Sequence, residues 1–457
     1  MSTKKSLQVC LLSCLLVLFV TSGAACSSTP SQSLLDRAKP FNLNYWRVTD
    51  QPDDFGEIVT RFKVFYPNIN ITVQNIRAEE YKNALLEAWA EDRGPDIFSI
   101  PVSQLHEYKT KISPLPSEVT TVKTTIKKSF LSTEAQLSEE KISSPSLRAL
   151  RESYIETVPN DIIIDNQIQG LPLSMDSLVL YYNRDILNNA HIAVPPTTWD
   201  QFIEDAKLTT LVDKERNFIQ NGAALGTANN LGYSTDLLSL LMLQNGTVME
   251  TGARATFDQA AVNDPSYYPG QEALKFYTDF ANPGSDRYTW NAKMSSAFQI
   301  FIEGRLAFYF GYIDDLKKIK ESAPKLNFDI VPVPQLSGSP RQINYGNYWL
   351  ETVSKKTKYP NEAWAFLLFA TQPDNNATFL ERAKRPTALR SLVDKQLNDY
   401  DLAAFAKSVL TSKTWYHGRN YESVDKTFKE MIRAIENQTM DYAAALKYGE
   451  EKVNLTY

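Results

Sequence analysis

The region from residue 41 to 101 alternates between strand-like and helix-like segments. The strand-like segments are 41–48, 69–76 and 95–101, and the helix-like segments between them are 55–67 and 78–94. The first helix-like segment repeats apolar residues at helical spacing and stops at Pro67, and the second ends at Gly94. A β-α-β-α-β order predicts a parallel sheet with helices on both faces.

The same alternation continues along the rest of the chain, with one weaker region. Residues 102–160 are richer in Ser, Thr and Lys, and their weak periodicity predicts surface helices and loops. Strand character returns at 168–187, and the last 90 residues or so are mostly helix-like. With 457 residues, the chain is long enough for two or three α/β domains.

The N-terminus has the layout of a secretory signal. Lys4 and Lys5 precede an apolar run over residues 7–20, which is followed by the small residues TSGAAC. A membrane-spanning helix needs about 20 apolar residues, so this run is too short to span comfortably. We predict that residues 1–25 are removed on export.

Cysteine usage suggests what the remaining thiol does. Cys10 and Cys14 lie in the removed segment, so Cys26 is left at the cleavage junction without an internal partner. The junction resembles a bacterial lipoprotein signal, whose cysteine carries the lipid, although Gly23 stands where Leu is usual. We predict lipidation at Cys26 followed by a flexible tether over residues 26–40, with ordinary cleavage after Ala25 as the alternative.

Composition and motifs exclude several function classes. A pI near 5.5 provides no basic field for nucleic acid. The histidines His106, His191 and His417 are far apart, and the sequence has no H-E-x-x-H, C-x-x-C, G-x-S-x-G or glycine-rich phosphate motif. We therefore expect no metal, no cofactor and no catalytic triad. A pair of carboxylates that hydrolyses glycans stays open among 53 acidic residues.

Ordered segments from residue 41 to the C-terminus resemble one protein family. The matching segments are RFKVFYPNINITVQNI, EYKNALLEAWAEDRGPDIFSI, GLPLSMDSLVLYYNRDIL, TTWDQFIEDAKLTT, FIEGRLAFYFGY and NEAWAFLLFA. In this order they resemble the bacterial extracellular solute-binding proteins of family 1, the maltose-binding-protein-like receptors of ABC importers. The resemblance implies a type II periplasmic-binding-protein fold, in which two α/β lobes with mostly parallel sheets flank a ligand cleft. The expected limits are 41–174 and 336–385 for lobe 1, and 175–335 and 386–457 for lobe 2.

A sugar site needs aromatic faces for the pyranose rings and charged groups for the hydroxyls. Asp176 interrupts the apolar run that begins at Leu171, and the resemblance places it where the chain passes between lobes. A carboxylate there needs a partner, either a ligand hydroxyl or a nearby basic residue in a salt bridge. Tyr312 follows Gly311 where family members often have a stacking Trp, and it is the strongest aromatic candidate.

Further candidates come from the resemblance, each with a core, surface or structural alternative. Tyr45 and Trp46 end the first strand, and only one of them can face the cleft if the strand alternates. Asp96 opens the third strand and could instead cap backbone amides. In NYGNYWLE, Gly346 allows close approach, and Asn347 and Trp349 compete with the neighbouring tyrosines. The remaining candidates are Tyr233, Tyr345, Arg385 and Tyr421.

We expect an exported, lipid-anchored and monomeric solute-binding protein at the cell surface or in the periplasm. It would capture a carbohydrate and deliver it to an ABC permease, contacting the membrane only through its lipid and breaking no bond. The alternatives are an extracellular glycan-processing enzyme with a carboxylate pair, and the same fold binding a peptide, a polyamine or a phosphorylated glycerol.

Overall fold

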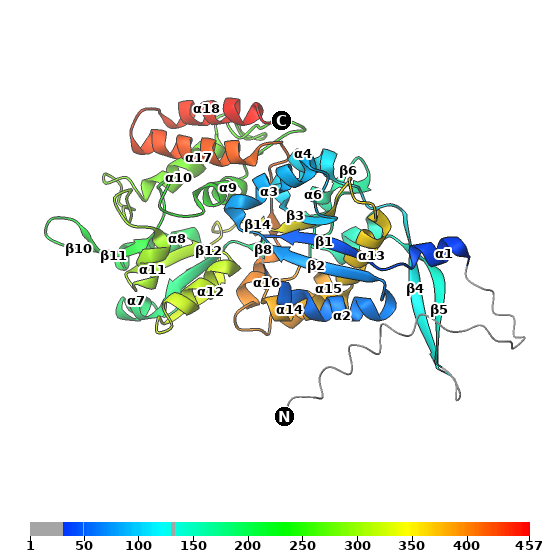
Figure 1. Cartoon of the computed structure of the whole chain (residues 1–457). Helices are drawn as coiled ribbons and strands as arrows, with labels where there is room; N and C mark the ends of the chain where they lie inside the picture. Colours follow the sequence, from blue (N-terminus) through cyan, green and yellow to red (C-terminus); the bar gives the residue numbers. More distant parts are fainter. Residues whose placement is uncertain (1–30, 49, 129–132) are drawn as a thin grey trace, which may run out of the picture.

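The chain folds into two bodies, each with its own sheet and its own hydrophobic core (Figure 1). The computed structural model describes residues 31–48, 50–128 and 133–457. The predicted signal peptide and the start of the predicted tether lie outside the described residues. Within the described part of the chain, no helix is both long and apolar enough to cross a membrane.

The first body is built on a sheet with the strand order β15–β3–β1–β2. Its strands are β1 (Phe41–Arg47), β2 (Ile69–Asn75), β3 (Ile97–Pro101) and β15 (Trp349–Val353). β1 pairs in parallel with β2 and with β3, which confirms the parallel sheet predicted for residues 41–101. β15 arrives from much later in the chain and pairs antiparallel with β3, placing Trp349 opposite Pro101.

Helices cover this sheet with apolar faces, whose residues recur at helical spacing. The helices of the first body are α1 (Gln32–Arg37), α2 (Gly56–Phe65), α3 (Ala78–Ala90), α4 (Leu105–Tyr108), α5 (Leu147–Ser153), α6 (Thr157–Ile162), α13 (Pro360–Ala370), α14 (Pro373–Ala383) and α15 (Arg390–Gln396). In α2, Ile58 and Phe62 are four residues apart and fully buried; in α3, Leu85 and Trp89 repeat that spacing. Short strands β6 (Ile163–Ile164) and β7 (Gln167–Ile168) form a small hairpin.

Residues 118–128 and 133–143 form the two strands of a long antiparallel hairpin, so the prediction of surface helices and loops was wrong for these residues. Its strands are β4 (Glu118–Lys128) and β5 (Thr133–Ser143), and the hairpin projects from the first body (Figure 1). Val119 and Val122 are buried at its base, as suits strands rich in β-branched residues. Arg37 of α1 forms an ion pair of 2.8 Å with Glu139. We propose that the tether ends before α1.

The second body has a mixed sheet with the order β10–β11–β12–β9–β13. Its strands are β9 (Val179–Asn183), β10 (Leu211–Val212), β11 (Phe218–Ala223), β12 (Leu306–Gly311) and β13 (Phe328–Pro332). β11 and β12 are parallel, whereas β9 lies antiparallel to β12 and β13 because it enters directly from the first body rather than through a helical crossover.

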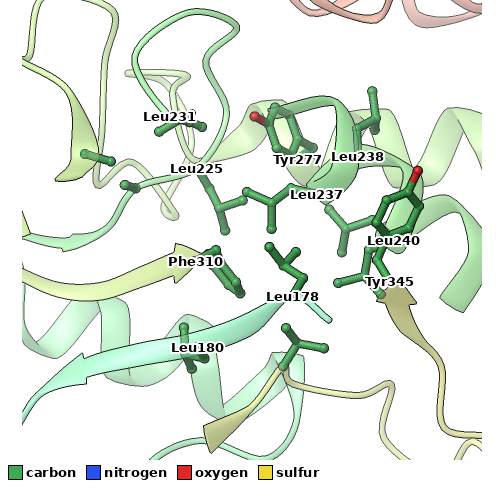
Figure 2. Close-up of a cluster of buried hydrophobic side chains, with 14 of the residues drawn as sticks. Leu178, Leu180, Leu225, Leu231, Leu237, Leu238, Leu240, Tyr277, Phe310 and Tyr345 are labelled. Carbon is green, nitrogen blue, oxygen red and sulfur yellow. The ribbon is translucent and has the colours of Figure 1, made fainter. Parts of the chain in front are cut away.

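Helices surround the second sheet, and the last two of them pack on other helices. They are α7 (Arg184–Asn189), α8 (Trp199–Leu208), α9 (Ser234–Gln244), α10 (Pro269–Asp279), α11 (Ala297–Ile302), α12 (Ile313–Ser322), α17 (Tyr421–Glu436) and α18 (Tyr442–Asn454). Figure 2 shows Leu178 and Phe310 from the strand side gathered against Leu237 of α9, with Tyr345 beside them. α9 is buried over most of its surface, which explains its nearly continuous apolar sequence.

The bodies are joined by a small sheet with the order β16–β14–β8. Its strands are β8 (Asp176–Ser177), β14 (Asn344–Asn347) and β16 (Ser412–Lys413), and α16 (Ala403–Val409) packs beside them. Met175 belongs to the first core and Leu178 to the second, so the chain changes body at β8. Leu389 packs in the first core and Tyr345 in the second. We therefore propose that lobe 1 continues past residue 385 and that lobe 2 reaches β14.

Candidate functional site

A pocket of about 280 Å³ lies between the two bodies and is called the interlobe pocket here. Its lining residues are Pro101, Val102, Ser103, Gln104, Asp161, Asp236, Tyr345, Gly346, Asn347, Trp349, Thr414, Trp415, Tyr416, His417 and Tyr421. Residues 101–104 leave the carboxyl end of β3, which is where open α/β sheets place their ligands. Both bodies therefore supply walls to one cavity.

Asp236 brings a carboxylate to the second-body wall. It lies in the first turn of α9, is 8% exposed, and accepts hydrogen bonds from Tyr312 at 2.8 Å and Tyr421 at 3.1 Å. Burial raises the pKa of Asp236 to about 6, although the two phenol hydrogen bonds lower it. At neutral pH it is mostly ionised, and a carboxylate has roughly four acceptor positions, so it can still accept from a ligand.

Asp161 and His417 form a second polar cluster, which ties the two bodies together. Asp161 of α6 accepts hydrogen bonds from Tyr348 and Thr414, each at 2.7 Å. The imidazole of His417 lies between Asp161, at 3.4 Å, and Glu250. Burial lowers the pKa of His417, but hydrogen bonds to both carboxylates raise it to about 10. His417 is therefore a cation at neutral pH.

This cluster predicts a stability loss in alkali. Because the folded-state pKa of His417 exceeds its unfolded value near 6.5, its contribution is full below pH 6.5 and is lost as the pH rises toward 10. We expect the free energy of unfolding to fall by about 1–2 kcal/mol across this window, after discounting for partial exposure.

Urea melts at pH 6.5 and 9.5 measure this loss. His417→Gln should have a flatter pH profile than wild type, whereas His191→Asn, at an exposed histidine with positive φ, should keep the wild-type profile. Equal slopes in wild type and His417→Gln would contradict the assignment.

Two of the aromatic rings in the pocket have exposed area to offer. Trp349 and Tyr421 are half-buried, whereas Trp415 and Tyr416 are only 3% and 5% exposed. The indole of Trp415 donates to Ser239 at 3.1 Å, and the hydroxyl of Tyr416 donates to Thr456 at 2.7 Å. Trp349 packs edge-on against Tyr81. Trp349 and Tyr421 are therefore the rings that can present area to a ligand.

The structure brings some of the predicted site residues together in the interlobe pocket. They are Tyr345, Gly346, Asn347, Trp349 and Tyr421. Asn347 is exposed at the end of β14, next to Trp349. A Cβ at Gly346 would lie 2.7 Å from Met175 and 3.2 Å from Ser412, so glycine there permits the close packing of the crossing strands.

Asp176 does not line the interlobe pocket. Its carboxylate accepts the backbone N–H of Ile313 at 2.9 Å and of Ser177 at 2.8 Å, so it caps the N-terminus of α12. Burial raises the pKa of Asp176 to about 8 despite these bonds. The carboxylate in the apolar run is explained by these backbone partners, and neither a ligand contact nor a salt bridge is needed to account for it.

Tyr312 and Tyr233 lie behind the pocket wall. Tyr312 is 4% exposed, donates its hydroxyl to Asp236, and packs edge-on against Tyr233 with ring centroids 4.9 Å apart. Neither is a lining residue. Tyr312 therefore positions Asp236 and does not offer a stacking face.

The candidates on the first sheet also point elsewhere. Tyr45 is fully buried and donates its hydroxyl to Glu351 at 2.5 Å, which matches its core alternative. Trp46 is half-buried but does not line the pocket. Asp96 lies at the opposite end of β3 and accepts from the Asn44 N–H at 2.9 Å, which matches its capping alternative.

Arg385 joins the two bodies on another side. Its guanidinium contacts Asp50 of the first body at 2.6 Å and Asp314 of α12 at 2.6 Å, and its side chain is 14% exposed. Lys82 of α3 makes a similar bridge, to Glu107 at 3.0 Å and Glu422 of α17 at 3.1 Å. These pairs fix the relative position of the bodies in this structure.

Sequence reasoning missed the carboxylates of the pocket. Asp161 and Asp236 are two of 53 acidic residues, with no motif to mark them. Asp236 did carry a signal, because it interrupts the apolar helix STDLLSLLMLQ much as Asp176 interrupts its own apolar run. His417 lies in TWYHGRNY, where only Tyr421 was selected.

The match to a family model covers most of the chain. The model of the bacterial extracellular solute-binding proteins matches residues 57–406. This chain belongs to the bacterial extracellular solute-binding proteins. Members of this family are binding proteins that act outside the cytoplasm, which agrees with a site of ring faces and hydrogen-bonding groups.

Relatives within the family are distant. The maltodextrin-binding protein MdxE of Bacillus subtilis is 26% identical over 259 residues, covering 54% of this chain and 57% of its own length. The sn-glycerol-3-phosphate-binding periplasmic protein UgpB of Agrobacterium fabrum is 28% identical over 150 residues, covering 31% of this chain and 30% of its own. The chain therefore spans less than two thirds of the length of each of these curated relatives.

Solved structures share the fold across nearly the whole chain. The cyclic α-maltosyl-1,6-maltose binding protein from Arthrobacter globiformis superposes with a TM-score of 0.72 at 17% identity, covering 91% of this chain and 99% of its own. The sugar-binding protein MalE from Xanthomonas citri gives 0.70 at 18% identity, covering 91% and 97%. The fold is therefore the two-lobed type II periplasmic-binding-protein fold that the sequence resemblance implied.

Proposed function

We propose that this solute-binding protein captures a carbohydrate in the interlobe pocket and delivers it intact to an ABC permease. The observation that carries the proposal is that half-buried rings from both bodies, Trp349 and Tyr421, line one cavity with the carboxylates Asp161 and Asp236. Ring faces cover the apolar faces of a pyranose, and charged acceptors bind its hydroxyls strongly. Relatives named for maltodextrin and sugar binding support the ligand class.

A thermal-shift screen tests the ligand class. A ligand at 100 times its dissociation constant adds about 2.7 kcal/mol of stability, so a binder raises the melting temperature measurably. Mono- and oligosaccharides should stabilise the protein, whereas peptides and glycerol phosphates should not. Chromatography of the incubated sugars should return them uncleaved, and cleavage products would favour a glycan-processing enzyme instead.

Closure of the two bodies on the ligand would depend on Arg385 and Asp314. Asp314→Asn removes the partner of Arg385 in the second body while Asp50 in the first remains. If this pair forms only in the closed state, its loss weakens apparent ligand affinity about threefold to fivefold, the equivalent of ~1 kcal/mol.

The Asp314 effect is measured by calorimetric titration at low and high salt. It should shrink at 0.5 M salt because screening weakens the pair. Glu321→Gln, which removes a pair with Lys317 inside α12, is the matched control and should not change affinity. An unchanged affinity in Asp314→Asn would show that the pair does not contribute to closure.

Export and anchoring belong to the same proposal. The predicted signal and Cys26 suit a receptor that is held at the membrane surface beside its permease. The intact mass of the membrane-extracted protein tests this. Removal of residues 1–25 should lower the mass of the full chain, and lipidation of Cys26 should add the mass of the acyl groups.

A further inference from the structure

The interlobe pocket is rich in negative charge. Among the described residues that line it there is no lysine or arginine, whereas Asp161 and Asp236 are both present. His417 is a cation, but it lies between two carboxylates, Asp161 and Glu250, so that cluster keeps an excess of one negative charge. Asp236 adds another on the opposite wall.

The surroundings of the pocket do not reverse this sign. Lys82, which joins α3 to α17, is matched by the two carboxylates Glu107 and Glu422. Lys429 of α17 is paired with Asp425 at 2.7 Å. Lys82 and Lys429 are therefore already paired with carboxylates. Arg419 is a further cation near His106, but no lysine or arginine among the described lining residues meets an anionic ligand in the pocket.

Asp236 is the carboxylate best placed to respond to a ligand charge. Its polar partners are the hydroxyls of Tyr312 and Tyr421, which are neutral, whereas Asp161 already faces the His417 cation. The cation Lys429 also acts on Asp236, but it is paired with Asp425. A buried carboxylate whose direct hydrogen-bond partners are neutral gains most when a cation arrives. Tyr421 and Trp349 offer ring area to such a cation as well.

We propose that the carbohydrate bound in the interlobe pocket carries an amine, and that Asp236 selects it over neutral and phosphorylated sugars. This inference rests on the proposed function and narrows its substrate class to amino sugars. The ammonium of a hexosamine unit donates to Asp236, and the sugar ring lies against Trp349 or Tyr421. A phosphate or carboxylate substituent finds no basic partner among the described lining residues.

Matched sugar pairs test the proposal. Hexosamine disaccharides of gluco, galacto and manno configuration are titrated calorimetrically at pH 6.5 beside their N-acetylated forms, in which an uncharged acetamide replaces the ammonium. Maltose and glucose 6-phosphate complete the panel. In at least one pair the free amine should bind at least tenfold more tightly, and glucose 6-phosphate should not bind.

The Asp236→Asn variant assigns the preference to one residue. The amide keeps an acceptor, and the tyrosine hydroxyls can rotate to serve it, so the melting temperature should stay close to wild type. The amine preference should fall to less than twofold. Asp425→Asn removes a nearby charge that does not line the pocket and should leave the preference intact.

A pH series gives an independent readout. The charged and titratable groups facing Asp236 are Tyr312 before α12, Tyr345 of β14, and Tyr421, Asp425 and Lys429 of α17. Burial raises the pKa of all three tyrosines, so they stay protonated between pH 5 and 7. Protonation of Asp236 should therefore weaken amine binding severalfold between pH 6.5 and 5, and this loss should vanish in Asp236→Asn.

The outcomes separate the two claims. Neutral sugars that bind as tightly as every amine, or an amine preference that survives in Asp236→Asn, would overturn the inference and leave the carbohydrate function standing. Binding of no sugar at all would overturn both.

Discussion

Replacing Arg47 by Met lowers the free energy of unfolding by about 3–5 kcal/mol, because it removes the cation that faces the buried carboxylate of Glu351. Arg47 is 2% exposed and contacts Glu351 and Asp50 at 2.6 Å each. Glu351, at 1% exposure, would keep only neutral donors such as Tyr45, whose hydroxyl lies 2.5 Å away. The guanidinium also lies over the ring of Phe55, so packing is lost as well.

Urea melts at pH 7 measure the Arg47 effect, and two variants control it. Arg61→Met breaks an exposed pair with Glu57 on α2 and should cost less than about 0.5 kcal/mol. The double variant Arg47→Met, Glu351→Met removes both buried charges and should recover part of the loss. A change below 1 kcal/mol in Arg47→Met would show that the buried pair is not needed for the fold.

Replacing Trp349 by Ala weakens carbohydrate binding about 30-fold, the equivalent of ~2 kcal/mol. Trp349 is a half-buried ring of the first body that lines the interlobe pocket at the start of β15, just after the crossing strand β14. Removing the indole deletes a face that a pyranose can cover, and most of the neighbouring aromatic rings are too buried to replace it. Trp349→Phe should keep most of the affinity, since a flat face remains.

Trp46→Ala is the matched control for Trp349. Trp46 is also half-buried and lies in the same sheet, but it does not line the pocket. Titration of both variants with the sugar identified by the screen, after melts that establish folding, should show a loss for Trp349→Ala alone. Equal losses in both variants, or none in Trp349→Ala, would remove the ring from the site.

The fold was more predictable than the site, for physical reasons. Strands and helices repeat their side-chain directions with different periods, and the sequence of residues 41–101 shows both periods in turn. This alternation correctly predicted that β1, β2 and β3 pair in parallel. The β4–β5 hairpin was missed because polar Thr and Lys dilute its alternation, although its β-branched residues were a usable signal. The pairing of β15 with β3 joins segments about 250 residues apart, which no local pattern reports.

Whether a residue belongs to the site depends on the direction of its side chain, and local sequence patterns do not determine that direction. Tyr45 and Trp46 are adjacent, but strand alternation does not say which face the core covers; Tyr45 lies in the core. Asp176 is an unusual carboxylate in an apolar run, yet besides the N–H of its neighbour Ser177 its partner is the backbone N–H of Ile313 at the start of α12, distant in sequence. Several residues of the NYGNYW segment line the interlobe pocket, because the crossing strand β14 passes beside it.

A crystal structure of the complex with the sugar found by the screen tests the account most directly. We predict the sugar between the two bodies, with a ring against Trp349 or Tyr421 and a donor group within hydrogen-bond distance of Asp236. A sugar bound elsewhere, for example in the surface cavity lined by Trp199 and Phe276 on the second body, would contradict it.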